Sequence, residues 1–308
     1  MPAPCRCCGV GPPVHALERA WELEYEESED AIGWALEHAR RLGLPYHIIL
    51  SLFVRGMSRF NQGRLSEGLR DLQEGMRLAE QNNERYWLSR FPNTLGWAFG
   101  ELQDLDAALK LDIEGARVAR ENGYGKPEAQ SHLNLAGIYL EAGEPQTAFD
   151  HLQRAEKIFA EDVWFRWRYY IRLKTALARY WISRGDTRKA AGFAAEAVAL
   201  AEPRKARKHL AWAHKVLGDV AVMEERFGEA RQEYAAALDV LRHHHCPTLE
   251  WRIWLAAAGM ASSYRNVSLA EHYRGRCQSV IHSLADSITD GTLRGQFLGS
   301  EAIRKALV

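Results

Sequence analysis

Positions that need a small side chain recur about every forty residues along this chain of 308 residues. The intervals between successive positions run from 37 to 42 residues, and a second small residue follows each position after twelve residues. The first set comprises Gly56, Gly96, Ala136, Ala178, Gly218 and Ala258, with a degenerate copy at Arg19, and the second set comprises Ala31, Gly68, Ala108, Ala148, Ala190, Ala230 and Ala270. Self-similarity at this period predicts a solenoid of stacked helix pairs and argues against a globule with one central core.

The same spacing predicts how the two helices of a pair pack. Small residues twelve apart let the helices approach closely, and larger residues at plus three, such as Phe99, Tyr139 and Trp181, fill the space beside them. We therefore predict an all-α, right-handed superhelical solenoid of about seven helix hairpins over residues 15–289. A disordered tail is expected at residues 1–14, and a capping segment at residues 290–308.

Two segments carry more specific expectations. Apolar residues at helical spacing in the last segment should cover the open face of the last repeat, as terminal repeats require for solubility. These residues are Leu293, Phe297, Ile303 and Leu307. Pro92 fits either the first turn of a helix that begins at Ser89, at little cost, or a kink inside a helix that begins near Glu84.

The register of small residues resembles the tetratricopeptide repeat over roughly residues 16–289, although the usual period of that repeat is 34 residues. Several stretches within it are also similar to the C-terminal repeat region of large bacterial signalling ATPases, which include ATP-dependent transcriptional regulators and cyclase-linked ATPases. These stretches are residues 90–97, 164–168, 247–252, 284–285, 293–294 and 297–298. The resemblance implies a sensor and partner-binding arm. It does not imply nucleotide hydrolysis, because the chain has no Gly-x-x-x-x-Gly-Lys-Ser/Thr motif.

Composition narrows the range of partners. Forty basic and forty acidic residues give a formal net charge of zero, so bulk charge does not call for nucleic acid or an acidic membrane. The distribution is uneven, because residues 18–37 hold eight acids and one Arg, whereas residues 161–215 hold thirteen Lys and Arg against five acids. The N-terminus has no apolar signal region, and no apolar run reaches the roughly 18 residues of a membrane span, so we expect a cytoplasmic protein without a membrane partner.

The sequence offers little for catalysis or metal binding. His-Glu-x-x-His, Gly-x-Ser-x-Gly and paired Cys-x-x-Cys motifs are absent, so we predict no catalytic residue, no metal and no cofactor. Cys5, Cys7 and Cys8 resemble half a metal site, but no His or second Cys pair lies nearby. The run from His243 to His245 places its imidazoles about 100° apart on a helix, which favours a helix end over a metal site.

Residues 164–170 form the densest aromatic stretch, with Arg interleaved among Trp, Phe and Tyr. Such interleaving could stack on nucleic-acid bases. However, Trp164, Trp167 and Ile171 follow helical spacing, which favours burial between adjacent repeats over nucleic-acid binding.

The groove of the solenoid is the predicted binding site. In this fold the first helix of each pair lines the concave face, and its inward positions here are polar and basic, with two Trp. The predicted groove residues are Arg90, Asn93, Trp97, Asn134, Arg172, Arg179, Trp212, Lys215 and Arg252. Guanidinium and amide groups suit the backbone and carboxylates of an acidic or C-terminal peptide segment. The alternative is that Arg172 and Arg179 merely pair with acids on the next repeat, each pair contributing about 1 kcal/mol or less.

Three functional interpretations follow. The leading one is a non-catalytic protein- or peptide-binding scaffold or sensor arm of a bacterial signalling or transcription-control system. The second is a peptide-pheromone-type sensor whose superhelix changes curvature when a peptide fills the groove. The third, an enzyme with a site hidden in the groove, has no acid–base pair or metal set behind it. The acidic residues 22–30 are expected to form a solvated capping face, although an electrostatic contact with the basic middle of a second copy would give a homo-oligomer.

Overall fold

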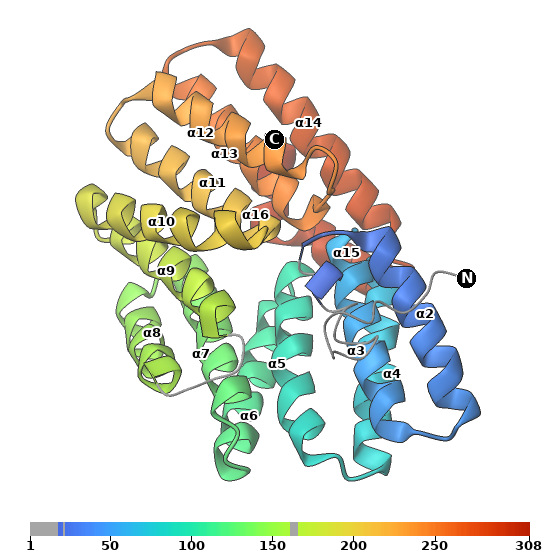
Figure 1. Ribbon diagram of the computed structural model, residues 1–308. Helices are drawn as coiled ribbons and strands as arrows, with labels where there is room; N and C mark the ends of the chain where they lie inside the picture. Colours follow the sequence, from blue (N-terminus) through green and yellow to red (C-terminus); the bar gives the residue numbers. More distant parts are fainter. Residues whose placement is uncertain (1–17, 21, 161–165) are drawn as a thin grey trace.

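The computed structural model describes residues 18–20, 22–160 and 166–308, which form helices and turns without a strand (Figure 1). The longer helices are α2 (Tyr25–Arg41), α3 (Pro45–Asn61), α4 (Leu65–Gln81), α5 (Arg85–Glu101), α6 (Leu105–Glu121), α7 (Gly125–Glu141), α8 (Pro145–Ala160), α9 (Arg166–Ser183), α10 (Thr187–Ala201), α11 (Arg207–Met223), α12 (Phe227–Leu241), α13 (Pro247–Ser263) and α14 (Val267–Asp286). A short 3-10 helix η1 (Glu202–Arg204) follows α10, and α15 (Gly291–Gly299) and α16 (Glu301–Leu307) end the chain. None of the described helices has the length and hydropathy of a membrane span.

Consecutive helices pack as hairpins, and each first helix also contacts the first helix of the next hairpin. Within the described residues, α2 is followed by the pairs α3–α4, α5–α6, α7–α8, α9–α10, α11–α12 and α13–α14. The helix expected around Arg19 as the partner of α2 falls largely outside the described residues. This ladder of helix pairs confirms the predicted all-α tetratricopeptide-type solenoid.

Small residues allow the close approach of paired helices, as the spacing predicts. A Cβ atom on Gly56 of α3 would lie 3.0 Å from the carbonyl oxygen of Gly68 on α4, and a Cβ atom on Gly68 would lie 2.8 Å from the carbonyl oxygen of Gly56. Real Cβ atoms do not approach backbone oxygens this closely, so the two helices meet only because both positions lack a side chain. Elsewhere the small residue makes room for a ring, since a Cβ atom on Gly218 would lie 2.5 Å from Tyr234.

The hairpin turns share one backbone conformation. Gly63, Gly143 and Gly185 take positive φ angles of 80°, 75° and 74° between their two helices, and Gln103 takes the same left-handed conformation at 62°. This conformation satisfies carbonyl groups at the end of the first helix. In three of the turns, side chains then cap the second helix. Asp104 accepts a hydrogen bond from the backbone N–H of Ala107, Asp186 does the same for Lys189, and Asn266 does the same for Leu269.

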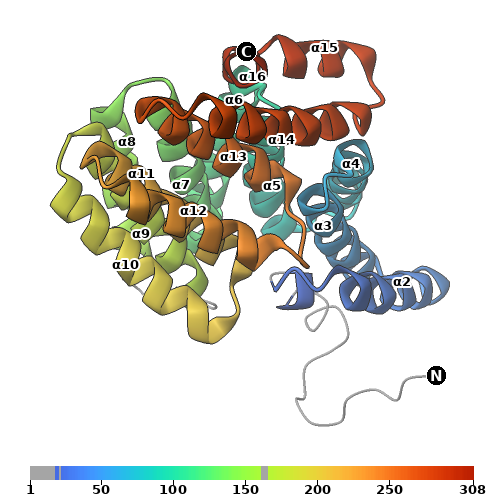
Figure 2. The same ribbon diagram turned by 90° about the horizontal axis from the view of Figure 1, so that it is seen from above.

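The two ends of the array meet, so the helix pairs close on themselves instead of forming an open spiral (Figure 2). Arg207 at the start of α11 forms an ion pair of 2.7 Å with Glu24, and Lys208 donates a hydrogen bond of 2.8 Å to Asn61 at the end of α3. Arg252 on α13 forms an ion pair of 2.9 Å with Glu101 at the end of α5. These contacts bring the later helices across the concave side of the earlier ones.

The C-terminal helices α15 and α16 share an apolar core with the first hairpins. Phe297 and Ile303 are buried in a cluster that reaches from α14 to the first hairpins, with Leu293 and Leu307 packed partly buried against it. Figure 2 places α15 and α16 against α14. The backbone N–H of Thr289, just before α15, donates a hydrogen bond of 2.9 Å to the hydroxyl of Ser66 on α4.

The structure also resolves the local alternatives. Helix α5 begins at Arg85, so Pro92 lies inside the helix and not in its first turn. Trp167 is partly buried against a cluster that contains Ile171, in keeping with burial between repeats. Trp164, like the cysteines at positions 5, 7 and 8 and the tail 1–14, lies outside the described residues.

Candidate functional site

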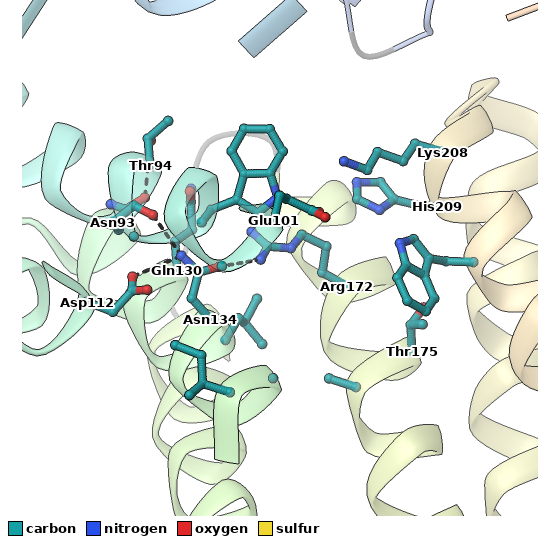
Figure 3. Close-up of a pocket in the computed structure, with 18 of the residues that line it drawn as sticks. Asn93, Thr94, Glu101, Asp112, Gln130, Asn134, Arg172, Thr175, Lys208 and His209 are labelled. Atoms are coloured by element: carbon teal, nitrogen blue, oxygen red, sulfur yellow. Dashed lines mark hydrogen bonds between the residues drawn. The ribbon is translucent and has the colours of Figure 1, made fainter. Parts of the chain in front are cut away.

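A central pocket of about 240 Å³ lies on the inner side of the first helices. Helices α5, α7 and α9 supply one wall, and the N-terminal end of α11 faces them across the opening (Figure 3). Residues of α3 and α13 complete the rim because the array closes on itself. The pocket therefore exists only where helices from both halves of the chain come together.

The structure brings eight of the nine predicted groove residues to this pocket. They are Arg90, Asn93, Trp97, Asn134, Arg172, Arg179, Trp212 and Arg252. Lys215 does not line this pocket, and its predicted role in binding stays a prediction. Its ammonium group lies 2.7 Å from the carboxylate of Asp219, one turn further along α11, and this pair holds the side chain on its own helix.

A network of side-chain amides forms one wall of the pocket (Figure 3). The Nδ2 atom of Asn134 donates to the carbonyl oxygen of Asn93 at 2.7 Å and to the carboxyl group of Asp112 at 2.9 Å. Its Oδ1 atom accepts a hydrogen bond of 2.8 Å from Arg172. Arg90 in turn donates to the side-chain oxygen of Asn93. The two guanidinium groups are thus held by neutral amides.

The arginines of the pocket fall into two groups. Arg179 lies 3.5 Å from Glu141 on the neighbouring hairpin, and Arg252 lies 2.9 Å from Glu101 across the closed array, so both have carboxylate partners. Among the described residues, neither Arg90 nor Arg172 forms an ion pair with a carboxylate. The alternative of simple pairing with acids therefore holds for Arg179 and fails for Arg172.

Further polar groups also line the pocket. Lys208 and His209 face Arg172 from α11 (Figure 3), and Gln130 lies on α7. The Nε2 atoms of Gln130 and His209 are buried without a hydrogen-bond partner in the described part of the chain. Burial, together with the nearby guanidinium of Arg168, holds the pKa of His209 well below its usual value, so this imidazole is neutral at pH 7.

Two indole rings line the pocket, each beside a cation. The ammonium group of Lys208 lies 4.8 Å from the ring centre of Trp97, and the guanidinium carbon of Arg179 lies 5.6 Å from that of Trp212. The Nε1 atom of Trp97 donates a hydrogen bond of 3.1 Å to Glu101. Flat apolar surface next to excess positive charge suits a ligand that carries both apolar groups and carboxylates.

In the described part of the chain, no group of three or more His, Cys, Asp or Glu side chains is placed to hold a metal ion. The run at residues 243–245 follows the end of α12, and its imidazoles turn toward different acids. His244 lies 3.9 Å from Glu24, whereas His245 lies 3.4 Å from Glu250.

Fold and pocket together define a class, an all-α repeat protein with a basic pocket on its concave side. No protein-family model matches the chain, and no curated protein has a similar sequence. Its structure is similar to that of NprR in complex with its cognate peptide NprX, with a TM-score of 0.63 and 13% identity over 96% of this chain and 84% of that one.

Two further solved structures share the architecture. A Rap protein complexed with Competence and Sporulation Factor has a TM-score of 0.61 at 13% identity, with 96% of this chain and 93% of that one covered. The Cut9–Hcn1 hetero-tetramer of APC/C has a TM-score of 0.56 at 14% identity, with 96% of this chain and 48% of that one covered. Identities this low establish a common repeat fold and no more.

Proposed function

We propose that this protein is a non-catalytic binding protein that holds an acidic or C-terminal peptide segment in its central pocket. The observation that carries the proposal is the pair Arg90 and Arg172, whose guanidinium groups meet amides and no carboxylate among the described residues. Burial and the neighbouring Arg90 lower the pKa of Arg172, so an anionic ligand would relieve an unfavourable cluster of positive charge.

A peptide-responsive sensor is the second candidate. The closure of the array favours this function, because helices from both halves of the chain line the same pocket. A ligand in the pocket would contact the two halves together and so favour one arrangement of them. Two structures of similar fold, the NprR and Rap complexes, hold a peptide and Competence and Sporulation Factor respectively. That likeness supports a peptide as ligand here.

We also propose a cellular role for the protein and a division of its chain. Resemblance to the repeat arms of signalling ATPases favours a cytoplasmic regulatory role, with residues 15–289 as the binding array and 290–308 as its cap. Homo-oligomer formation through the acidic residues 22–30 has less support, since Glu24 and Glu29 already pair within the chain with Arg207 and Arg64.

The test is calorimetric titration of the purified protein with triglutamate, which has a free carboxy-terminus, and with neutral triglutamine. We expect the wild type to bind triglutamate more tightly, and Arg172→Glu to weaken binding at least about tenfold, because a charge-assisted hydrogen bond is replaced by repulsion. Lys215→Glu is the matched control on the same face, since Lys215 lies outside the pocket, and its affinity should stay within about twofold.

Equal binding of triglutamate by the wild type and by Arg172→Glu, or no binding by the wild type, would rule out an anion-selective pocket. Turnover of ATP by the purified protein would contradict the non-catalytic part of the proposal.

A further inference from the structure

A buried carboxyl group lies in the wall of the pocket, at a position that carries no charge in four of the other hairpins. Asp112 on α6 has no exposed surface. It stands sixteen residues after the small residue Gly96. The equivalent positions of the other hairpins hold Leu72, Leu152, Ala194 and Tyr234, and in the last hairpin the partly exposed Arg274. A fully buried carboxyl group costs free energy, and among the described hairpins this position holds one only in α5–α6, which calls for a reason outside packing.

Helix α5 is shaped around this carboxyl group. A Cβ atom on Gly96 would collide with the Oδ2 atom of Asp112. The glycine of this hairpin therefore makes room for a polar side chain, where Gly56 makes room for Leu72 and a paired helix. Asp112 Oδ2 has no hydrogen-bond partner within the described residues, whereas Oδ1 accepts from Asn134.

The hydrogen bonds fix which way the Asn134 amide points. Both acceptors of its Nδ2 atom, the carbonyl oxygen of Asn93 and the carboxyl group of Asp112, lie on one side. The Oδ1 atom is consequently turned toward Arg172, which donates to it at 2.8 Å. A rotated amide would bring oxygen against oxygen on one side and N–H against the guanidinium on the other.

We propose that Asp112 is the positioning residue of the central pocket: through Asn134 it holds the guanidinium of Arg172 in the orientation that receives an anionic group. This inference rests on the proposed function, since it concerns the same site. Asp112 lines the pocket without any exposed surface, so its effect on a ligand passes through the amide of Asn134.

The carboxyl group also adjusts the charge of the pocket. Burial raises the pKa of Asp112 well above its usual value, against the smaller opposing effects of the hydrogen bond from Asn134 and the charges of Arg172 and Arg90. Ionisation of Asp112 adds a negative charge behind the arginines. An anion should therefore bind more tightly at pH values below the raised pKa and more weakly above it.

Two substitutions separate positioning from folding. Asp112→Leu places in this hairpin the residue that Leu72 and Leu152 provide in others, so the protein should fold, but Asn134 loses an acceptor. We expect the affinity for triglutamate to fall at least about tenfold. Asp112→Asn keeps an acceptor oxygen, so its affinity at pH 5.5 should stay within about threefold of wild type. Asp71→Asn, a change at a buried carboxyl group outside the pocket, is the matched control and should not alter affinity.

Calorimetric titrations from pH 5.5 to 9, where the probe carboxylates stay ionised, supply the second readout. The wild-type affinity should fall as pH rises, and that of Asp112→Asn should be flatter. The side-chain amide resonance of Asn134, followed by NMR in the ligand-free protein, should titrate in the wild type and shift in Asp112→Leu. Wild-type affinity in Asp112→Leu, or an Asn134 resonance unchanged by that substitution, overturns the inference; loss of triglutamate binding by the wild type itself would instead count against the proposed function.

Discussion

Replacement of Phe91 by Ala should lower the free energy of unfolding by about 3–5 kcal/mol, the largest effect we expect from one substitution. Phe91 on α5 is fully buried. Its ring lies 5.7 Å from those of Phe53 and Trp87, and a Cβ atom on Gly75 of α4 would lie only 2.5 Å from it. The ring thus fills the junction between two hairpins, and the rigid helices around it have little freedom to close the cavity. Urea denaturation followed by circular dichroism measures the change.

Two further variants test the assignment of this effect to packing. Gly75→Ala should destabilise by about 1–3 kcal/mol, because the added methyl group meets the ring of Phe91. Ile113→Ala removes a side chain that is 52% exposed on α6 of the same hairpin as Phe91 and should cost under about 0.5 kcal/mol. A loss below about 1 kcal/mol for Phe91→Ala, or a similar loss for Ile113→Ala, would contradict a packed junction at this point.

The fold is predictable from the sequence because its signals are local. Paired small residues such as Gly56 and Gly68 lie twelve positions apart, and they meet in one hairpin. Closure of the array leaves no such signal, since Glu24 and Arg207 meet across 183 residues with no repeating pattern to connect them. The sequence also could not place Pro92 inside α5, because a helix that begins at Ser89 and one that begins near Glu84 are both compatible with a proline at this position.

The pocket was only partly predictable for the same reason. Register alone located the residues on the inward face of each first helix, although their role in binding stays a prediction. Lys215 lies outside the pocket, where it pairs with an acid four residues later on its own helix. Register missed Lys208 and His209, which reach the pocket because the ends of the array meet. Asp112 lies on a second helix, and its only signal was a carboxyl group at a position where four of the other hairpins carry no charge.

Acid should destabilise the protein through a pair of histidines between α7 and α8. The Nδ1 atoms of His132 and His151 lie 3.0 Å apart, and since one hydrogen bond holds one hydrogen, at least one of these nitrogens must be unprotonated. Burial, with smaller effects of His151, Arg154 and Arg120, lowers the pKa of His132 to about 3. Burial also lowers the pKa of His151, against the opposing effect of Asp150.

The lowered pKa values of His132 and His151 in the folded protein make acid destabilising. A folded-state pKa below the unfolded value means that the unfolded chain takes up a proton first as pH falls. The contribution to stability is therefore complete above about pH 6.5 and is lost progressively toward pH 3. With a pKa of 6.5 for His132 in the unfolded chain and about 3 in the folded protein, the free energy of unfolding should fall by about 2 kcal/mol between pH 7 and pH 5.

His132→Phe isolates this effect. The substitution keeps an aromatic ring in a buried position and removes the titrating group, and the Nε2 atom it deletes has no hydrogen-bond partner among the described residues. Urea midpoints at pH 5, 6 and 7 should fall less steeply for this variant than for the wild type, whereas His47→Gln, at an exposed position on α3, should leave the wild-type slope intact. Equal slopes for the wild type and His132→Phe would mean that the proton uptake responsible for acid unfolding occurs elsewhere in the array.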